Sequence, residues 1–267
     1  MKRLLISLLI LNNCLISIAQ DTLKWKKIKE ISIVSDFTWD IDPLNQLIIG
    51  EGTKISKYDS ELNLLFQESI KSAGNITSID ARNPMKILLF HQQQQHFSII
   101  DNSLNFQQQE DFTSYHIGNA LHLSGSETPS KIWVFDQENT KIIALNQNKS
   151  QNILIENTKA LLDFNSIYKF KEYGNDLYLV DTIKGIYQLD NFGSLLNSAS
   201  IPKIKAIHVE SNAIILLLDH HLVIYSSLFL LKNKIKLPKN NFTDFRKVGE
   251  YYYFKGNQRI EKFSFSK

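Results

Sequence analysis

The stretch that decides the fold is 175–190, which reads NDLYLVDTIKGIYQLD. Leu177 to Val180 is a four-residue run of apolar and aromatic side chains, too short for a helix and typical of a buried β-strand. A polar residue, Asp181, ends this run, and Lys184-Gly185 then supplies a turn residue that tolerates a positive φ angle. A second strand is predicted over 185–189, so the stretch as a whole predicts a β-hairpin.

Similar apolar runs recur along the chain, so the hairpin is one copy of a repeat. The six runs begin at residues 47, 87, 132, 177, 215 and 251, which are 36–45 positions apart. Each run is followed by a polar residue and a second predicted strand, and further extended segments flank most of these pairs. Four short antiparallel strands at this period are typical of a β-propeller blade. The sequence therefore predicts an all-β fold, a six-bladed β-propeller with four antiparallel strands per blade.

The two ends of the chain are predicted to complete one blade together. The sixth unit contains only three predicted strands, and the segment 24–33 belongs to no unit. Pairing that segment with the final strand would close the ring, because an open ring leaves strand edges and blade faces exposed to water. We therefore expect Trp25 to lie alongside Phe263 and to pack between blades.

The hairpin also resembles the repeat of the NHL-like group of six-bladed propellers. Asn175–Thr182, continued by Gly185–Asp190, is close to that repeat's order of strand, Asp, turn and strand, and Lys131–Leu145 follows it more loosely. In the other four units the glycine that usually precedes the strand is mostly missing, and the residues that follow the run are Glu51, His91, Asp219 and Lys255. The resemblance implies this fold and a function in binding, and it implies no catalysed reaction.

The first 19 residues are predicted to be a signal peptide, followed by a single propeller over 20–267. Lys2 and Arg3 precede an apolar run at Leu4–Ile10, which is too short to span a bilayer. Ser17-Ile18-Ala19 then places small residues where a leader peptidase reads them, so cleavage is expected before Gln20.

An alternative for the leader is lipidation of Cys14, although Asn13 is a poor residue before a lipidated cysteine. The leader and the Lys-, Ile- and Asn-rich composition resemble exported envelope proteins of the Bacteroidetes. We expect a chain exported to the periplasm or associated with the outer membrane.

Composition excludes several classes of protein. Hydrophobic residues are 43% and charged residues 21%, which excludes intrinsic disorder. The formal net charge is +3, or +1 without Lys2 and Arg3, whereas a general nucleic-acid binder needs a large excess of basic groups. The one cysteine excludes a disulfide framework and a cysteine-rich metal site.

No enzyme, metal site or cofactor is predicted. The chain has no Gly-x-Ser-x-Gly elbow, and its 10 glycines form no phosphate-binding loop. The adjacent His220 and His221 would point to opposite faces of a strand, which does not suit a shared metal. Asp40 and Asp42 are two apart on a predicted innermost strand, so both could face the central channel. That pair would suit acid–base catalysis only if residues from other blades converged on it.

A candidate ligand site lies at the mouth of the central channel. Propeller ligands usually sit where loops enter the innermost strands and where the second and third strands turn. Aromatic and acidic residues in these segments suit a sugar or a basic peptide, or they cap the turns and fill the channel with water-bridged polar groups. These channel-mouth residues are Asp36, Trp39, Glu51, Tyr115, His116, Asp136, Asp181, Asp219 and His220.

A second candidate surface comes from the predicted topology. The outer strand of the fifth blade and the closing N-terminal strand should occupy neighbouring blades, and both are rich in lysine. Such a surface could dock an acidic partner or anionic lipid headgroups, or its lysines only discourage edge-to-edge pairing. We call these residues the basic rim: Lys24, Lys26, Lys27, Lys29, Lys232, Lys234, Lys236 and Lys239.

The sequence thus predicts an exported, non-enzymatic propeller that presents a rigid surface to a protein partner. We expect it to be accessory to an outer-membrane or cell-envelope assembly, as one propeller within a complex. Peripheral membrane contact is a further option. No nucleic-acid partner is expected. The alternative is a protein that binds or processes a carbohydrate or peptide at the channel mouth.

Overall fold

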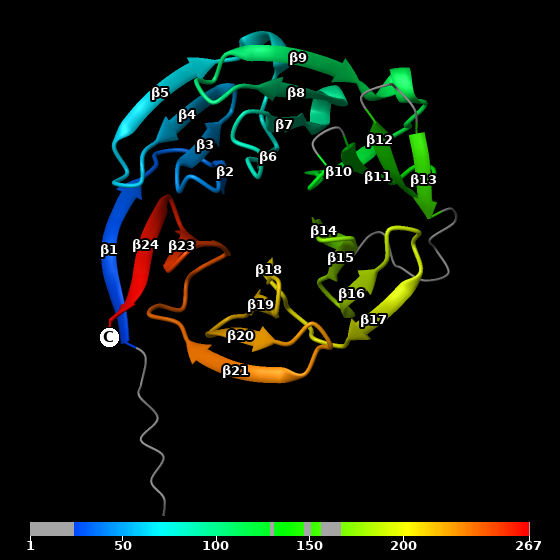
Figure 1. The fold of residues 1–267 in the computed structure, drawn as a ribbon. Coiled ribbons are helices and arrows are strands. Elements are labelled where there is room, and N and C mark those ends of the chain that lie inside the picture. Colours follow the sequence, from blue (N-terminus) through cyan, green and yellow to red (C-terminus); the bar gives the residue numbers. More distant parts are fainter. Residues whose placement is uncertain (1–23, 129–130, 147–150, 156–166, 267) are drawn as a thin grey trace, which may run out of the picture.

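The described part of the chain forms a ring of six four-stranded sheets around a central channel (Figure 1). The structure is a computed structural model that describes residues 24–128, 131–146, 151–155 and 167–266, without the side chains of 151–155 and 167–168. The predicted signal peptide lies outside these residues. Within them, no helix is long and apolar enough to cross a membrane.

Each sheet is one blade, and its strands follow chain order from the channel outward, except in the last blade. Blade 1 contains β2 (Thr38–Ile41), β3 (Leu47–Glu51), β4 (Lys54–Tyr58) and β5 (Leu64–Ser69). Blade 2 contains β6 (Ser78–Asp80), β7 (Ile87–His91), β8 (His96–Ile100) and β9 (Phe106–Asp111). Blade 3 contains β10 (Ala120–Gly125), β11 (Lys131–Asp136), β12 (Lys141–Asn146) and β13 (Gln151–Ile155). Blade 4 contains β14 (Ile167–Tyr173), β15 (Asp176–Asp181), β16 (Gly185–Leu189) and β17 (Leu195–Ala199). Blade 5 contains β18 (Ala206–Glu210), β19 (Ala213–Leu217), β20 (His221–Tyr225) and β21 (Leu231–Lys236). Blade 6 contains β22 (Asp244–Val248), β23 (Tyr251–Gly256), β24 (Arg259–Ser266) and β1 (Lys24–Ser32). Short 3-10 helices connect or extend some of these strands: η1 (Lys71–Ala73), η2 (Gln92–Gln94) and η3 (Phe112–Tyr115). The predicted all-β, six-bladed propeller is confirmed.

The burial of each strand follows from its place in the blade. The apolar runs that defined the repeat are the second strands, and β7 is buried over its whole length. Outermost strands such as β5 are exposed throughout. Because all pairings within a blade are antiparallel, the innermost strands begin on the same face of the ring as the turns between second and third strands. We call this the start face.

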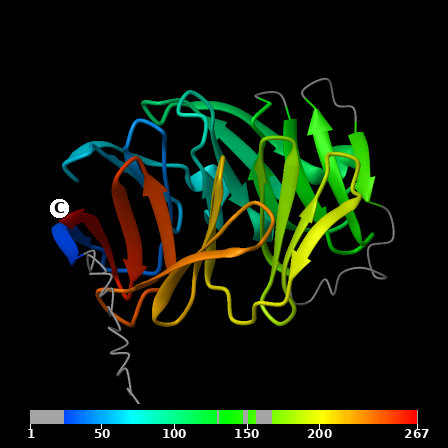
Figure 2. The same cartoon turned by 60° about the horizontal axis from the view of Figure 1, so that its bottom comes forward.

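The core lies between the blades. Six hydrophobic clusters fill the structure, one between each pair of neighbouring blades, which stand side by side around the ring in Figure 2. Trp133 of β11, for example, packs with Phe170 of β14 and Leu179 of β15. Each blade is therefore held on both faces, and the ring is stable only when it is closed.

Closure occurs as the sequence predicts. β1 pairs antiparallel with β24, so the N-terminal strand completes blade 6 beside the last strand of the chain (Figure 1). Trp25 lies opposite Phe265 in this register, and its ring is 6.0 Å from that of Phe263. The same indole packs edge-on against Tyr252 at 5.2 Å. The expected contact between Trp25 and Phe263 is confirmed.

A repeated turn joins the third and fourth strands in several blades. Asp59, Asp101 and Asp190 each accept hydrogen bonds from the backbone N–H groups two and four residues ahead, at 2.8–2.9 Å. One position in this turn has a positive φ angle, as at Leu62 (57°) and Leu104 (67°). The aspartate holds the turn closed, so these leucines keep a conformation that β-strand residues rarely adopt.

Candidate functional site

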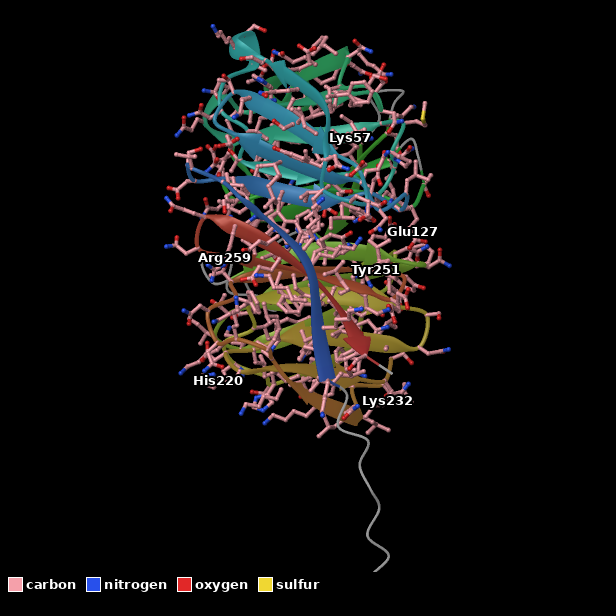
Figure 3. All side chains as sticks on the ribbon, turned by 90° about the vertical axis from the view of Figure 1, so that its left-hand side faces the viewer. Lys57, Glu127, His220, Lys232, Tyr251 and Arg259 are labelled. Carbon is pink, nitrogen blue, oxygen red and sulfur yellow. The ribbon has the colours of Figure 1, made fainter. Side chains whose placement is uncertain are left out.

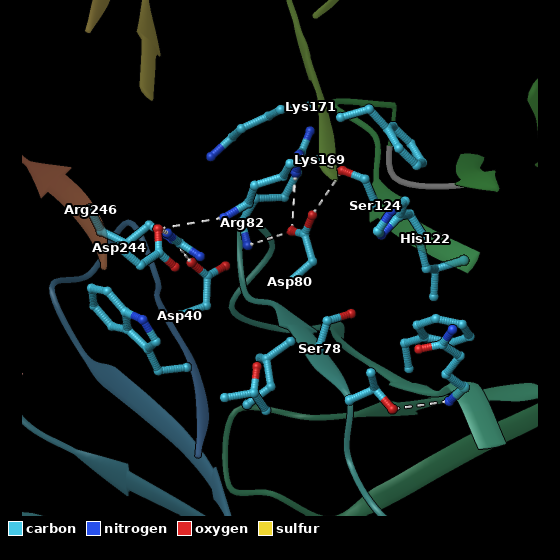
Figure 4. A pocket seen from close by; sticks show the side chains of 18 of the residues that line it. Asp40, Ser78, Asp80, Arg82, His122, Ser124, Lys169, Lys171, Asp244 and Arg246 are labelled. Carbon is cyan, nitrogen blue, oxygen red and sulfur yellow. Dashed lines mark hydrogen bonds and ion pairs between the residues drawn. The ribbon is translucent and has the colours of Figure 1, made fainter. Parts of the chain in front are cut away.

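The central channel holds a densely charged site. A cavity of about 380 Å³, which we call the channel cavity, is lined by the innermost strands of all six blades. A second cavity of about 520 Å³ opens near the turns that follow the innermost strands. Arg82 and Lys171 line both cavities, so they stand where the two meet. The charged residues of the channel cavity are Asp40, Asp80, Arg82, Lys169, Lys171, Asp244, Arg246 and Lys255 (Figure 4).

Strand alternation brings these side chains to the channel. Lys169 and Lys171 are two apart on β14, and Asp244 and Arg246 are two apart on β22. Side chains two apart on a strand point to the same side, so each innermost strand offers one row of residues to the channel. Six such rows converge, although they are far apart in sequence.

Arg246 joins blade 6 to blade 1 inside the channel. Its Nε donates to Asp40 Oδ1 at 2.6 Å, and its Nη1 donates to Asp244 Oδ1 at 2.8 Å. Lys169 of blade 4 reaches the same Asp244 oxygen at 3.6 Å. Burial alone would raise the pKa of Asp244, but Arg246 and Lys169 outweigh it and lower that pKa, so the carboxylate stays ionised.

Asp80 is the centre of a second network, between blades 2 and 3. Its carboxylate accepts from Arg82 Nε at 3.1 Å and from the Gly125 backbone N–H at 2.9 Å. Ser124 Oγ donates to it at 3.2 Å and accepts from Arg82 Nη2 at 3.0 Å. Burial opposes ionisation, yet Arg82 and Lys171 hold the pKa of Asp80 far below its ordinary value. The carboxylate is an anchor for neighbouring blades, with no proton to donate at neutral pH.

Lys171 differs from the other charged groups of the channel. No hydrogen bond or ion pair joins its ammonium to another residue in the part of the chain that the structure describes, and Figure 4 shows its side chain near that of Arg82. Burial, followed by the Arg82 guanidinium, lowers the pKa of Lys171 to about 8, although Asp40 and Asp80 act in the opposite direction. The channel thus contains a cation, Lys171, while the nearby carboxylates of Asp40 and Asp80 already accept hydrogen bonds from arginines.

Of the nine channel-mouth residues, only Trp39 lines the channel cavity. It is 3% exposed, and the Arg246 guanidinium lies 4.9 Å from its ring centre. Asp136 and Asp181 are fully buried. Asp136 accepts from the Gly118 and Asn119 backbones at 3.3 and 3.2 Å. Asp181 accepts two backbone hydrogen bonds at 2.8 Å from the residues that follow it.

The other channel-mouth residues are spread over the start face. Glu51 pairs with Lys54 at 2.7 Å, and Asp219 pairs with Lys205 at 2.9 Å. A hydrogen bond from Lys205 is the main cause of the lowered pKa of Asp219. Tyr115 is buried in the cluster between blades 2 and 3. Asp36, His116 and His220 are exposed.

The structure also separates the carboxylates of the expected pair on the first innermost strand. Asp40 lines the channel cavity, whereas Asp42 lies in the turn after β2 and is fully buried. Asp42 accepts from the Gln46 N–H at 2.9 Å and lies 3.4 Å from Lys57 Nζ. The expectation that both carboxylates face the channel is wrong, because the chain turns directly after Ile41.

Among the charged channel residues, only Asp40 was singled out from the sequence, because the candidate sites lay mainly in the turns. The available signal was the presence of charges at alternate positions of innermost strands, such as Lys169 and Lys171. A strand at the centre of a packed fold normally carries apolar residues, so a charged pair there indicates a water-accessible channel.

The two lysine-rich strands of the basic rim are neighbours, as the topology predicts. Trp25 Nε1 donates to Lys236 O at 2.7 Å, which joins β1 to the end of β21. Figure 3 shows this side of the ring, where β1 runs beside β24. Lys27 and Lys239 both pair with the buried Glu261, at 3.1 and 2.9 Å. These two lysines therefore help to hold blade 6 in place.

The remaining basic-rim lysines are exposed. Lys29 donates to the Glu61 carbonyl and Lys232 to the Asn212 carbonyl. Among the described residues, no ion pair engages the other four, which are Lys24, Lys26, Lys234 and Lys236.

In the described ranges, no group of three or more His, Cys, Asp or Glu side chains is arranged to hold a metal ion. No protein-family model matches the chain, and no curated protein matches it. Three solved structures illustrate what it is similar to.

The chain is 12% identical to BBS1N, solved in complex with ARL6DN, with a TM-score of 0.60 over 92% of this chain and 98% of that one. It is 10% identical to virginiamycin B lyase from Staphylococcus aureus, with a TM-score of 0.59 over 90% and 99%. It is 8% identical to BamB from Moraxella catarrhalis, with a TM-score of 0.54 over 91% and 98%. At these identities the likeness shows the fold alone: a six-bladed β-propeller.

Proposed function

We propose that this protein is an exported, non-enzymatic propeller that binds an acidic protein partner through its basic rim, as an accessory of an outer-membrane or cell-envelope assembly. The observation that carries the proposal is the hydrogen bond from Trp25 to Lys236, which fixes the two lysine-rich strands beside each other. A propeller similar to this chain, BBS1N, was solved in a complex with another protein, which supports the class of function.

The charge of the rim supports an acidic partner. Four exposed lysines without ion pairs to described residues come from strands that are remote in sequence, so the fold itself gathers them. Grouped charges of one sign raise the rate of association with an oppositely charged surface, and the effect weakens with salt. Edge protection needs only scattered lysines, whereas here two neighbouring strands both carry them.

Apolar residues beside the lysines support a protein as the partner. Leu228, Leu230 and Leu231 stand at the start of β21 and are 63–70% exposed. Protein interfaces combine apolar contacts with a polar or charged rim. β21 and the turn before it offer both.

The rigidity of the ring suits a docking function. Glu261, buried between Lys27 and Lys239, ties the closing strand to the chain that leaves blade 5. Burial would raise the pKa of Glu261, but the hydrogen bonds from these two lysines lower it, so the carboxylate remains charged at neutral pH. A surface built on such anchors binds with little backbone movement.

The finer assignments belong to the same proposal. Export rests on the basic and apolar leader that ends at Ala19, and mass spectrometry of the exported protein should find Gln20 as the first residue. Kinship with NHL-like propellers and a Bacteroidetes origin rest on the pattern of 175–190 and on composition.

The proposal is tested by charge reversal in a pull-down from envelope extracts. The variant replaces Lys24, Lys26, Lys234 and Lys236 with Glu. The matched control replaces four exposed lysines elsewhere: Lys71, Lys86, Lys184 and Lys203. We expect wild type and control to retain one protein at near-equimolar ratio, and the rim variant to lose it at least tenfold. Equal retention by all three, or capture by protein-free anionic vesicles alone, would refute a protein partner at the rim.

A further inference from the structure

We propose that the channel cavity binds a small ligand carrying an oxyanion, a phosphate or carboxylate group, which is held by Lys171 and Arg82 where the two cavities meet. This site is separate from the basic rim and does not depend on the function proposed for it.

The charge balance of the cavity favours an anion. Five cationic side chains and three carboxylates line it. A low-dielectric cleft with an excess of one charge raises the local concentration of the opposite ion. The cationic residues are Arg82, Lys169, Lys171, Arg246 and Lys255.

The three carboxylates are already occupied. Asp40 accepts from Arg246 and from the Ala81 backbone N–H, the latter at 2.9 Å. Asp244 accepts from Arg246 and from the Phe245 backbone, also at 2.9 Å. Asp80 accepts from Arg82, Ser124 and Gly125. Each carboxylate ties neighbouring chain segments together and is poorly placed to move toward a further cation.

Lys171 is left with its charge unmatched. Lys171 is partly buried, and an ammonium that is withdrawn from water without a partner is costly, so proteins normally pair such a group or hydrogen-bond it. The Arg82 guanidinium, which lines the same two cavities, repels it. An anion placed between Lys171 and Arg82 would satisfy both cations at once, so the site is built for a ligand that the chain does not supply.

Arg82 can contribute to the same ligand. It donates to Asp80, to Ser124 Oγ and to the Glu172 carbonyl, at 3.0–3.3 Å. These contacts use one N–H at each nitrogen, so two of its five N–H groups remain for a ligand. A guanidinium fixed at three points is pre-organised for a planar or tetrahedral oxyanion.

The size of the cavity limits the ligand to a small molecule. A volume of about 380 Å³ lies at the lower end of the range for small-molecule sites. The indole of Trp39 and the ring of Phe37 line the same cavity and would contact the less polar part of a ligand. Inorganic phosphate and small organic acids both meet these requirements.

The test is isothermal titration of the purified protein with inorganic phosphate and, separately, with succinate, at pH 7 and constant ionic strength. The variant is Lys171→Met, which keeps an unbranched side chain of similar length and removes its charge. The matched control is Lys184→Met, on the exposed turn between β15 and β16. Lys171→Arg restores the charge and should recover binding in part.

We expect wild type to bind at least one of the two anions with a submillimolar Kd, and Lys171→Met to weaken that binding about tenfold or more. Lys184→Met should stay within about twofold of wild type. Tighter binding of phosphate indicates a phosphorylated ligand, and tighter binding of succinate indicates an organic acid. The proposal fails if neither anion binds below 10 mM (roughly the limit of specific binding), if Lys171→Met binds like wild type, or if Lys184→Met weakens binding equally.

Discussion

Trp25 Nε1 donates a hydrogen bond of 2.7 Å to the carbonyl oxygen of Lys236, across 211 positions of sequence. The indole also packs against Tyr252, Phe254 and Phe263 of blade 6, at 5.2–6.0 Å between ring centres. The Trp25 side chain therefore contacts both blade 5 and blade 6, whose other strands come from the C-terminal part of the chain. This contact therefore supports ring closure in addition to the β1–β24 pairing.

Replacement of Trp25 by Ala should lower the free energy of unfolding by about 3 kcal/mol, because it removes a large aromatic side chain and a hydrogen bond together. Trp25→Phe keeps most of the packing and should cost about 1 kcal/mol, for the lost hydrogen bond. Urea unfolding followed by circular dichroism measures both. A loss below about 1 kcal/mol for Trp25→Ala would show that closure rests on the β1–β24 pairing alone.

A buried ion pair provides a second test of how blades are joined. Lys57 of β4 and Asp42 are both fully buried, with Nζ and Oδ2 3.4 Å apart, and Lys57 also donates to the Asn102 carbonyl of blade 2 at 3.1 Å. Lys57→Ala leaves a buried carboxylate without its cation, which should cost about 3–5 kcal/mol. Lys54→Ala on the same strand removes an exposed pair and should cost about 1 kcal/mol or less.

Chemical denaturation of the two single variants, and of Lys57→Ala combined with Asp42→Asn, completes the experiment. The double variant should recover part of the loss, since no uncompensated charge remains. Equal stability of the Lys57 and Lys54 variants would contradict the role given to the pair.

The channel carboxylates predict how stability depends on pH. The folded-state pKa of Asp80 lies far below the ordinary value of 3.8. A carboxylate with a lowered folded-state pKa contributes stability that is complete above its ordinary pKa and is lost as the pH falls toward the folded-state value. Urea unfolding should therefore show a decline below about pH 4, and Asp80→Asn should make that decline shallower. An unchanged slope in Asp80→Asn would place the acid-sensitive groups elsewhere.

The architecture was predictable because its signal is local and repeated. The buried second strands, such as Leu177–Val180, are short apolar runs at a nearly constant period, and their position in the blade follows from their hydrophobicity. A further local signal was overlooked: Asp59, Asp101 and Asp190 each stand four residues before an Asn or Ser and close the same turn.

The channel could not be predicted in the same way. The pair formed by Arg246 and Asp40 joins residues 206 positions apart, and nothing local to either strand indicates the other. The positions of the channel-mouth residues in the turns could not be predicted for a related reason. The sequence shows that Asp136 and Asp181 end buried strands. Whether such a carboxylate points into the channel or accepts N–H groups of its own turn or of a neighbouring loop depends on backbone geometry.

Lys171 also predicts an unusual stability change. Its folded-state pKa of about 8 lies below the ordinary 10.5, so its charge destabilises the fold fully below pH 8, and this cost disappears as the pH rises toward 10.5. In buffer free of oxyanions at pH 7, Lys171→Met should therefore melt at a higher temperature than wild type, and the difference should shrink by pH 10. A lower melting temperature for Lys171→Met would indicate that the ammonium stabilises the fold.

The same titration should make anion binding depend on pH. The charged groups that act on Lys171 are Asp40, Asp80, Arg82 and Arg246. The charge of Asp80 does not change between pH 7 and 9, because its pKa is lowered far below this range. His208 stays neutral over this range, because burial lowers its pKa from 6.5. Lys171 itself loses its proton in this interval, so the affinity for an anion should fall as the pH rises. Sulfate is the suitable probe, because its own charge is constant over this range.

The control for this experiment is Lys171→Met. Lys169 and Lys255 also line the cavity, and burial lowers the pKa of both, so some pH dependence should persist without Lys171. We expect the sulfate affinity of wild type to fall about tenfold more than that of Lys171→Met between pH 7 and 9. If the two proteins lose affinity in parallel, the anion responds to the general charge of the channel, and Lys171 is not the group that holds it.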